Sequence, residues 1–270
     1  MRLALKVVNK GLASNANWLM RGVEMRGYRD LADVLRQQIT DGVYSPGAVL
    51  PRITDLMAEY ELSRQTVREA IGVLSDEGLV VTKGRAGTVV RHRVRVRVPL
   101  SRYTRTLSTS PRGPWETACA DQGLDGYMQV VGVHRTDADE ETAELLEVPA
   151  GTPLVVRHRH AMLGREDVVQ IQRASYPAVL ADEVGLGDDT KRVGGALAAF
   201  AAAGHTPTTV SEHVLCRLPT SSEADELEIS SKVTILAITR VTRAAERVVE
   251  VLTTTTPADR VELLYESLPL

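Results

Sequence analysis

The sequence predicts an α+β protein of two domains: a helical domain that ends in a β-hairpin, and a larger domain built on a mostly antiparallel sheet. Apolar residues recur at three- and four-residue steps through residues 28–78, which is the period of amphipathic helices, and two β-rich runs follow. Beyond residue 113, β-rich and short helical segments interleave without a strict β-α-β order. The length of 270 residues fits two domains better than one.

The composition is that of a globular protein, with 43% hydrophobic and 25% charged residues. Aromatic residues make up only 4%, so we expect cores of Val, Leu, Ile and Ala. The two cysteines, Cys119 and Cys216, lie far apart and are expected to be free thiols. The sequence has no run of about 18 apolar residues and no signal-peptide pattern, so we expect a cytoplasmic protein.

The net charge of −3 hides an uneven distribution. Residues 1–112 hold 19 Lys and Arg against 10 Asp and Glu, whereas residues 113–270 hold 13 against 25. The first part therefore has a net charge of +9 and the second of −12. A basic first part favours a polyanionic partner for that part of the chain.

The first domain has the pattern of a winged helix. Three amphipathic segments predict helices that start near Tyr28, Ile53 and Arg64, and the β-rich runs 79–82 and 88–90 enclose a basic loop with glycines. The second and third helices, joined by a tight turn, form a helix-turn-helix, and the hairpin forms the wing. Such a domain places the start of its last helix in the major groove of DNA.

The second domain is predicted from alternating β-rich and helical segments. Strands are expected at residues 127–134, 153–163, 167–176, 212–218, 234–243 and 247–256. Short helices are expected at residues 117–120, 139–146, 196–203 and 221–227. Because the strands look hairpin-linked, we expect an antiparallel sheet.

Four segments are expected along the chain: a mobile N-terminal extension over 1–26, the DNA-binding domain over 27–91, a basic linker over 92–112, and the second domain over 113–270. Around the start of the linker, arginines occupy every second position from 91 to 97, with valines between most of them. An extended strand would bring these charges to one face. This face is either a solvated connecting strand or an extra contact with DNA phosphates.

The helix that begins at Arg64 is the candidate DNA-reading element. Its inner face takes Val67, Ala70, Ile71 and Leu74, which leaves Arg64, Gln65, Thr66, Arg68 and Glu69 pointing outwards. Arg can pair with guanine and Gln with adenine through two hydrogen bonds, whereas the hydroxyls of Ser63 and Thr66 suit phosphates. In the wing, Lys83 and Arg85 flank Gly84, where the backbone can approach a phosphate or the minor groove.

This stretch resembles the GntR family of bacterial regulators. The match runs without gaps from residue 28 to about 90 and includes Leu50-Pro51, Ser63-Arg64, Thr66-Val67-Arg68, Glu77-Gly78-Leu79 and Gly87-Thr88. The resemblance implies DNA contacts from Arg64, Thr66, Arg68 and a wing glycine, either Gly84 or Gly87. It also implies a homodimer that binds a palindromic operator.

The second helix departs from the family pattern. The family has an arginine near the start of this helix, where this chain has Thr54, and Arg52 stands where a serine cap is usual. Either Arg52 supplies the contact from its neighbouring position or the contact is lost. We therefore expect an operator that differs from the family's common one.

The second domain resembles the UTRA effector domain of HutC-type GntR regulators, which shares its fold with chorismate lyase. The resemblance spans roughly residues 110–268 and includes Pro149–Pro153, Arg157-His158-Arg159, Ser175-Tyr176-Pro177, Arg217-Leu218-Pro219 and Val249-Glu250. It implies a chorismate-lyase-like antiparallel sheet that binds a small-molecule effector.

Arg157 and Arg159 are the candidate effector-binding residues. They lie two apart on a predicted strand, so both guanidiniums face one side, which suits a phosphate or carboxylate. The resemblance adds Ser175, Glu212 and Glu250 to the expected set. The alternative is that the two arginines pair with acidic residues of the sheet, for which Glu212 and Glu250 are the plausible partners.

His158 and His160 are expected on the opposite side of the same strand. A His-x-His pair can ligate a metal, but no third ligand lies near in sequence. We therefore interpret the pair as ordinary packing or surface residues and predict no metal site and no cofactor.

These patterns together predict a DNA-binding transcriptional regulator, a repressor released by a small-molecule effector. One alternative is a DNA-binding protein whose second domain serves only for dimerisation. Another is an enzyme, which the chorismate-lyase-like fold invites, but the sequence offers no convincing nucleophile and base. We expect no enzymatic activity, and association with the nucleoid.

Overall fold

The computed structural model describes residues 27–99, 112–190 and 192–265 of the chain. The expected extension over 1–26 and most of the expected linker lie outside these residues. The chain divides into two compact units, one up to His92 and one from Arg93 onwards. Each unit is described by itself.

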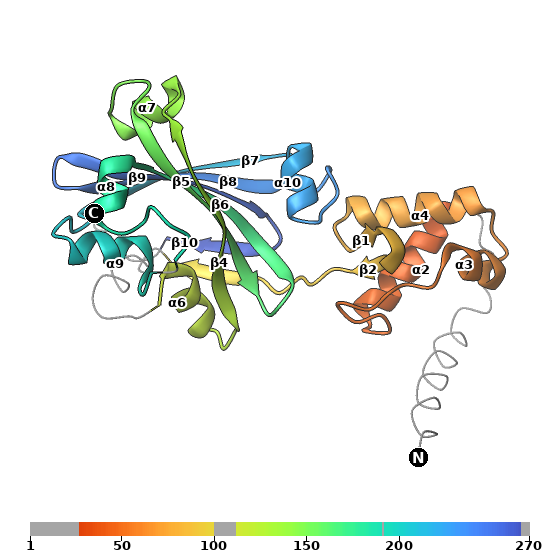
Figure 1. Cartoon of the computed structure of the whole chain (residues 1–270). Coiled ribbons are helices and arrows are strands. Elements are labelled where there is room, and N and C mark those ends of the chain that lie inside the picture. Colours follow the sequence, from red (N-terminus) through yellow and green to blue (C-terminus); the bar gives the residue numbers. More distant parts are fainter. Residues whose placement is uncertain (1–26, 100–111, 191, 266–270) are drawn as a thin grey trace, which may run out of the picture. The chain divides into compact units, whose positions relative to one another are not determined.

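From residue 27 to residue 92, the first unit has three helices and a hairpin, in the order that the sequence predicts (Figure 1). Its helices are α2 (Tyr28–Thr40), α3 (Ile53–Tyr60) and α4 (Arg64–Asp76). Strands β1 (Val80–Lys83) and β2 (Gly87–Val90) pair antiparallel around a 3-10 turn at Gly84–Ala86. This is the winged helix-turn-helix that the sequence predicts.

The core of this unit forms where the apolar faces of the helices meet. Leu31 and Leu35 of α2 and Val67 and Leu74 of α4 are completely buried in one cluster. Since these residues recur at helical spacing, burying them directs the remaining side chains of α4 outwards. The packing of α2 thus fixes which face of α4 is available to a partner.

The second unit is built on a six-stranded antiparallel sheet of order β4-β5-β6-β9-β8-β7. Its strands are β4 (Gly126–Asp137), β5 (Pro153–Leu163), β6 (Asp167–Pro177), β7 (Thr209–Arg217), β8 (Ile235–Ala244) and β9 (Arg247–Pro257). The pairing of β6 with β9 joins two antiparallel triplets into one sheet. The predicted α+β class with a mostly antiparallel sheet is confirmed.

In the described part of this unit, five short helices surround the sheet (Figure 1). They are α6 (Pro114–Ala120), α7 (Glu140–Leu146), α8 (Ala178–Glu183), α9 (Gly195–Ala202) and α10 (Ser221–Glu226). Residues of α6, α8 and α9 pack in apolar clusters with one set of alternate strand residues, whereas α7 and α10 pack with the other set. The helices therefore cover both faces of the sheet.

Two strands far apart in the sequence form a separate two-stranded ribbon in this unit. Strand β3 (Val96–Pro99) pairs in parallel with β10 (Val261–Leu264). Val96 and Val98 of β3 are buried, in a cluster that also holds Trp115 and Val261. Part of the segment that we expected to be a linker is thus a strand within the second unit.

The arginines at the start of that segment are paired with nearby groups. Arg91 is buried in the first unit and donates a hydrogen bond to the carbonyl oxygen of Gly78, at 2.6 Å. In the second unit, Arg93 pairs with Asp259 at 3.3 Å and Arg97 with Glu262 at 3.1 Å. These arginines are therefore not a row of free charges: Glu262 of β10 and Asp259, just before β10, pair with two of them.

Candidate functional site

Helix α4 presents a row of polar side chains to solvent from a capped N-terminus. Ser63 is its N-cap and accepts a hydrogen bond from the backbone N–H of Thr66 at 3.1 Å. The cap satisfies one of the backbone donors that the first turn leaves unpaired. Arg64, Gln65 and Arg68 are exposed beyond it. The start of the helix is therefore fixed while its outer side chains stay available.

The two arginines of this row differ from most others in the chain. Within residues 27–99, the structure gives the guanidiniums of Arg64 and Arg68 no hydrogen-bond or ion-pair partner. Gln65 donates a hydrogen bond to Glu69 at 2.8 Å. The helix thus offers two unpaired cations and an amide, which are the groups that read guanine and adenine edges in the major groove.

Helix α3 begins without a side-chain cap, at the position where this chain has Arg52 instead of the family's usual serine. Arg52 occupies the N-cap position with an extended backbone and provides no side-chain cap. Thr54 is exposed and donates a long hydrogen bond of 3.4 Å to Asp55. Both side chains therefore lie on the surface of the helix-turn-helix.

The wing contains two glycines with positive φ. Gly84 has φ +39° at the start of the 3-10 turn, and Gly87 has φ +88° at its end. A Cβ at Gly87 would lie 3.3 Å from Cγ1 of Val49, so a side chain there is disfavoured by space as well as by φ. Arg85 is exposed at the tip between them, and Lys83 is half-buried at the end of β1.

The second candidate site is a cavity over one face of the six-stranded sheet. It has about 1050 Å³ of empty space, including the part that opens to solvent. Alternate residues of β5, β6, β8 and β9 form its floor, and residues of α6, α9, β3 and β10 form its walls. Four of the five predicted effector residues line it, namely Arg157, Arg159, Glu212 and Glu250.

Arg157 is held by the chain segment between α8 and α9. Its side chain is 3% exposed, and its guanidinium donates hydrogen bonds to the carbonyl oxygens of Leu186, Asp188 and Thr190. Burial lowers the pKa of this guanidinium. Because three carbonyls use its donors, Arg157 fixes the wall of the cavity, and the structure shows no pairing with Glu212 or Glu250, which was the alternative for this residue.

Arg159 lies in the same cavity with unused hydrogen-bonding capacity. Its Nε–H is buried and has no hydrogen-bond partner among the described residues. Gln172, its neighbour across the β5–β6 pairing, lines the cavity too. A buried donor without a partner costs free energy, so the cavity is suited to a ligand that accepts from Arg159.

Glu250 is the centre of a buried polar network that the sequence does not reveal. It is completely buried and pairs with Arg240 at 2.5 Å, and the hydroxyl of Tyr176 donates to it at 2.8 Å. Thr242 donates to the same carboxylate at 3.2 Å. Burial alone would raise the pKa of Glu250, but the charges of Arg240 and Arg159 lower it. The carboxylate is therefore an anion held on the cavity floor.

Ser175 does not reach the cavity. It pairs with Val156 and Val251, whereas Arg157 pairs with Ala174 in the next register position. Since side chains alternate along a strand, Ser175 faces the opposite side of the sheet from Gln170 and Gln172. The expectation that Ser175 lines the effector site is therefore wrong, because its side chain lies on the other face of the sheet.

Glu212 is half-buried on the edge strand β7 and lines the cavity from there. It accepts a hydrogen bond of 3.3 Å from the hydroxyl of Tyr265 and lies opposite Arg240 in the β7–β8 register.

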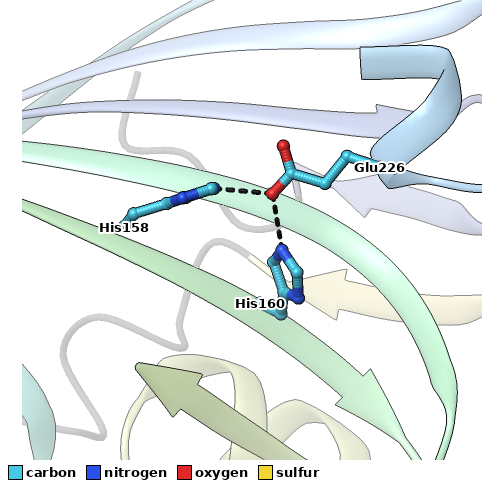
Figure 2. Close-up of side chains that lie close together, drawn as sticks. All are labelled: His158, His160 and Glu226. Carbon is cyan, nitrogen blue, oxygen red and sulfur yellow. Dashed lines mark hydrogen bonds and ion pairs between the residues drawn. The ribbon is translucent and has the colours of Figure 1, made fainter. Parts of the chain in front are cut away.

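His158 and His160 face away from the cavity, as strand alternation predicts. Glu226, at the end of α10, lies between their rings (Figure 2). Burial lowers the pKa of His158, against the opposing effect of the Glu226 charge. Sequence reasoning missed Glu226 because it is 66 residues away from His160.

Sequence profiles of known families match both units. The profile described as bacterial regulatory proteins of the gntR family matches residues 27–90, and the UTRA domain profile matches residues 121–262. No helix within the described residues is long and apolar enough to cross a membrane. The second profile alone covers more than half of the chain.

Known proteins resemble the chain over one or both units. An HTH-type transcriptional regulator of Rhizobium meliloti is 30% identical over 247 residues, which is 89% of this chain and 94% of the relative. The mannosyl-D-glycerate transport/metabolism system repressor MngR of Escherichia coli is 27% identical over 121 residues, 45% of this chain and 46% of the relative.

The crystal structure of PhnF from Mycobacterium smegmatis has the same fold, with a TM-score of 0.55 at 23% identity, over 88% of this chain and 99% of that one. Family profiles, a relative of nearly full length and the fold agree with one another. The chain belongs to the GntR family of transcriptional regulators, in the HutC-type branch that joins a winged helix to a UTRA domain.

Proposed function

We propose that this protein is a cytoplasmic repressor that binds a palindromic operator as a homodimer and is released by a small anionic effector. The observation that carries the DNA-binding part is the outer face of α4, where Arg64 and Arg68 are exposed beside a capped helix start. A single reading helix covers only a few base pairs, and two-fold symmetry doubles the site. The name of the relative MngR, a repressor, supports the direction of regulation.

The base-reading residues in this proposal are Arg64, Gln65 and Arg68. In the same proposal, Ser63, Thr66 and Arg52 contact phosphates, with Thr54 beside them. The wing, through Lys83, Gly84, Arg85 and Gly87, adds contacts with the backbone or the minor groove. Base contacts would supply the specificity of binding and phosphate contacts its salt dependence.

Operator binding by arginine variants tests this proposal. The operator is first obtained by selection from random DNA, and affinity is then measured by fluorescence anisotropy. We expect Arg64→Ala and Arg68→Ala each to weaken binding by about 1–3 kcal/mol per half-site. Arg165→Ala, an exposed arginine in the β5–β6 turn, is the charge-matched control. Normal operator affinity in both α4 variants would refute the assignment of the reading helix.

The effector in this proposal is a small carboxylate or phosphate. The buried Nε–H of Arg159 supports this, because an anionic oxygen would complete its hydrogen bonding. Gln170 and Gln172 would bind polar groups of the rest of the molecule, and Glu212 a hydroxyl or an amine. Arg157 would act indirectly, through the wall that it holds.

A thermal-shift screen of phosphorylated and carboxylated metabolites would identify the effector. Each compound that raises the melting temperature is then tested for release of the protein from its operator. We expect Arg159→Ala to weaken effector binding at least tenfold and to leave operator affinity unchanged. Arg173→Ala is the matched control, since Arg173 lies on the neighbouring strand and lines no part of the cavity. An equal response in both variants would remove Arg159 from the effector site.

The mechanism in this proposal is a change in the spacing of the two DNA-reading units. Effector binding would favour a dimer whose reading helices no longer fit both half-sites.

Sedimentation of the operator complex tests the stoichiometry, and one protomer per operator at micromolar concentration would contradict the dimer. Turnover of chorismate by the purified protein would contradict the absence of enzymatic activity. If no compound changed operator affinity, the second unit would serve dimerisation only.

A further inference from the structure

Three metal-ligating side chains converge on the sheet face that lies opposite the effector cavity. His158 and His160 come from β5, and Glu226 is the last residue of α10 (Figure 2). Oε1 of Glu226 lies 2.7 Å from Nε2 of His158 and 2.5 Å from Nε2 of His160. One ligand atom from each of the three residues lies within 4.8 Å of the others. Two imidazole nitrogens and one carboxylate oxygen therefore surround one point.

The elements that carry these ligands are fixed by their own packing. β5 pairs with β4 on one side and with β6 on the other along its whole length. α10 packs through Ala224 in a cluster with Ile171 and Ile235 of the sheet. Its start is held by a capping box between Thr220 and Glu223. The backbone positions of the ligands are thus set before any ion binds.

The surroundings of the ligands suit a cation better than a simple ion pair. The side chains of His158, His160 and Glu226 are 23%, 16% and 19% exposed, so the site is partly buried but open to solvent. Nε2 of His158 is buried and has no partner in hydrogen-bonding geometry among the described residues, although Glu226 is within ion-pair distance. A cation between this nitrogen and the carboxylate oxygen would satisfy both groups, with the nitrogen deprotonated.

The ligand set also indicates which cation fits. Imidazole and carboxylate bind Zn²⁺, Co²⁺ and Ni²⁺, whereas Mg²⁺ and Ca²⁺ prefer all-oxygen sites. Bonds of about 2.0–2.1 Å to Zn²⁺ separate two ligands of a tetrahedron by roughly 3.3 Å, so the Glu226 carboxylate would withdraw by less than about 1 Å. Three protein ligands leave a fourth position for water or another ligand.

We propose that His158, His160 and Glu226 bind one divalent transition-metal ion, with Zn²⁺ as the best fit, at a site separate from the effector cavity. The ion ties β5 to α10. β5 is also the strand that carries Arg157 and Arg159 on its other face, so the ion stabilises the strand that forms the cavity floor. Arg173 is the neighbour of His158 across the β5–β6 pairing, and its positive charge opposes the ion.

Titration of the full-length, tag-free protein with metal tests this proposal. After removal of metal with a chelator, we expect calorimetry with Zn²⁺ to give one site per chain. We also expect Co²⁺ to produce a visible absorption band typical of a site with nitrogen and oxygen ligands. His160→Ala and Glu226→Gln should each weaken Zn²⁺ binding at least tenfold. His205→Ala is the matched control, because His205 pairs with Glu183 at 2.9 Å in a cluster with a single histidine.

Two further measurements keep the result independent of folding. Zn²⁺ at a concentration that just saturates the wild type should raise the melting temperature of the wild type and of His205→Ala, and that of His160→Ala clearly less. Arg173→Ala keeps all three ligands and should bind Zn²⁺ more tightly than the wild type, because a nearby positive charge is removed. Absence of stoichiometric binding to the wild type, or equal binding by the wild type and the ligand variants, would leave the cluster as an ion pair and overturn the proposal.

Discussion

The arginines of α4 are exposed to solvent, whereas Arg157 and Arg240 of the cavity are buried. Arg64 and Arg68 are exposed and have no partner within residues 27–99. Arg157 and Arg240 are buried, and each is held by several groups of the protein or by a buried carboxylate. The difference follows from solvation, because water satisfies an exposed guanidinium whereas a buried one needs protein partners.

The two sets of arginines differ in how much of the folded structure depends on them. Replacing Arg64 or Arg68 is expected to cost little stability, since the structure gives them no hydrogen-bond or ion-pair partner within residues 27–99. The charged residues of the cavity are different, because Arg157 holds a loop and Arg240 pairs with a buried carboxylate. Variants of the two regions should therefore separate DNA affinity from folding.

The largest effect on stability is expected when the buried pair of the cavity is broken. Glu250→Ala would leave Arg240 buried without its carboxylate, and we expect a loss of about 3–5 kcal/mol in the free energy of unfolding. Tyr176 and Thr242 would lose an acceptor as well. Urea unfolding followed by circular dichroism measures the change. Glu166→Ala, in an exposed turn, is the control and should differ little from the wild type.

A moderate effect is expected at the cap of the reading helix. Ser63→Ala removes the acceptor for the backbone N–H of Thr66, and we expect a loss of about 1 kcal/mol. Hydrogen-exchange mass spectrometry on peptides from residues 28–90 measures this loss in the first unit alone. Ser75→Ala, in the last turn of the same helix, removes a hydroxyl that caps nothing in the structure described. If both variants exchanged alike, the cap would not stabilise the helix.

A loss of stability in acid is expected at the ion pair between Arg217 and Glu223, which is partly exposed. Arg217 and the backbone of Thr220 lower the pKa of Glu223 to about 2, against the effect of burial. A carboxylate with a lowered pKa in the folded state stabilises it above the unfolded pKa, so this contribution is lost as the pH falls from about 4.5 towards 2. Glu223→Gln should show a smaller decrease in melting temperature over that range. A decrease equal to that of the wild type would exclude the pair as its source.

The smallest effect is expected on the reading face. Arg68→Ala should change the free energy of unfolding by no more than about 0.5 kcal/mol, because no contact within the unit is removed. The same urea titration measures it. A loss as large as that of Ser63→Ala would mean that Arg68 stabilises the helix, and the contrast between the two regions would disappear.

Strand and helix periodicity predicted most of the fold, because both units bury one face of each element. The alternation in β5 places Arg157 and Arg159 on one face and His158 and His160 on the other, as expected. The reading face of α4 also follows from sequence, since Val67 and Leu74 fix the rotation of the helix. Helix α8 and strand β10 were not predicted.

The partners of the site residues could not be predicted from local pattern. The carbonyls that hold Arg157 belong to a loop about 30 residues away, and backbone carbonyls carry no sequence signal. The partner of Glu250 was missed because Arg240 lies on a different strand, ten residues earlier. Ser175 was misplaced because its family resemblance was weighed without its strand register. Such contacts depend on the register of the strands and on how the loops fold.

The parallel pairing of β3 with β10 sets an order for folding during synthesis. Arg97 and Glu262, which pair across this ribbon, are 165 residues apart in the chain. The core cluster and the hairpin of the helix-turn-helix and wing, by contrast, form within residues 28–90, so this part can fold soon after it leaves the ribosome. The other unit is completed only once β10 has been made. A nascent chain can therefore complete its winged helix-turn-helix well before its UTRA domain.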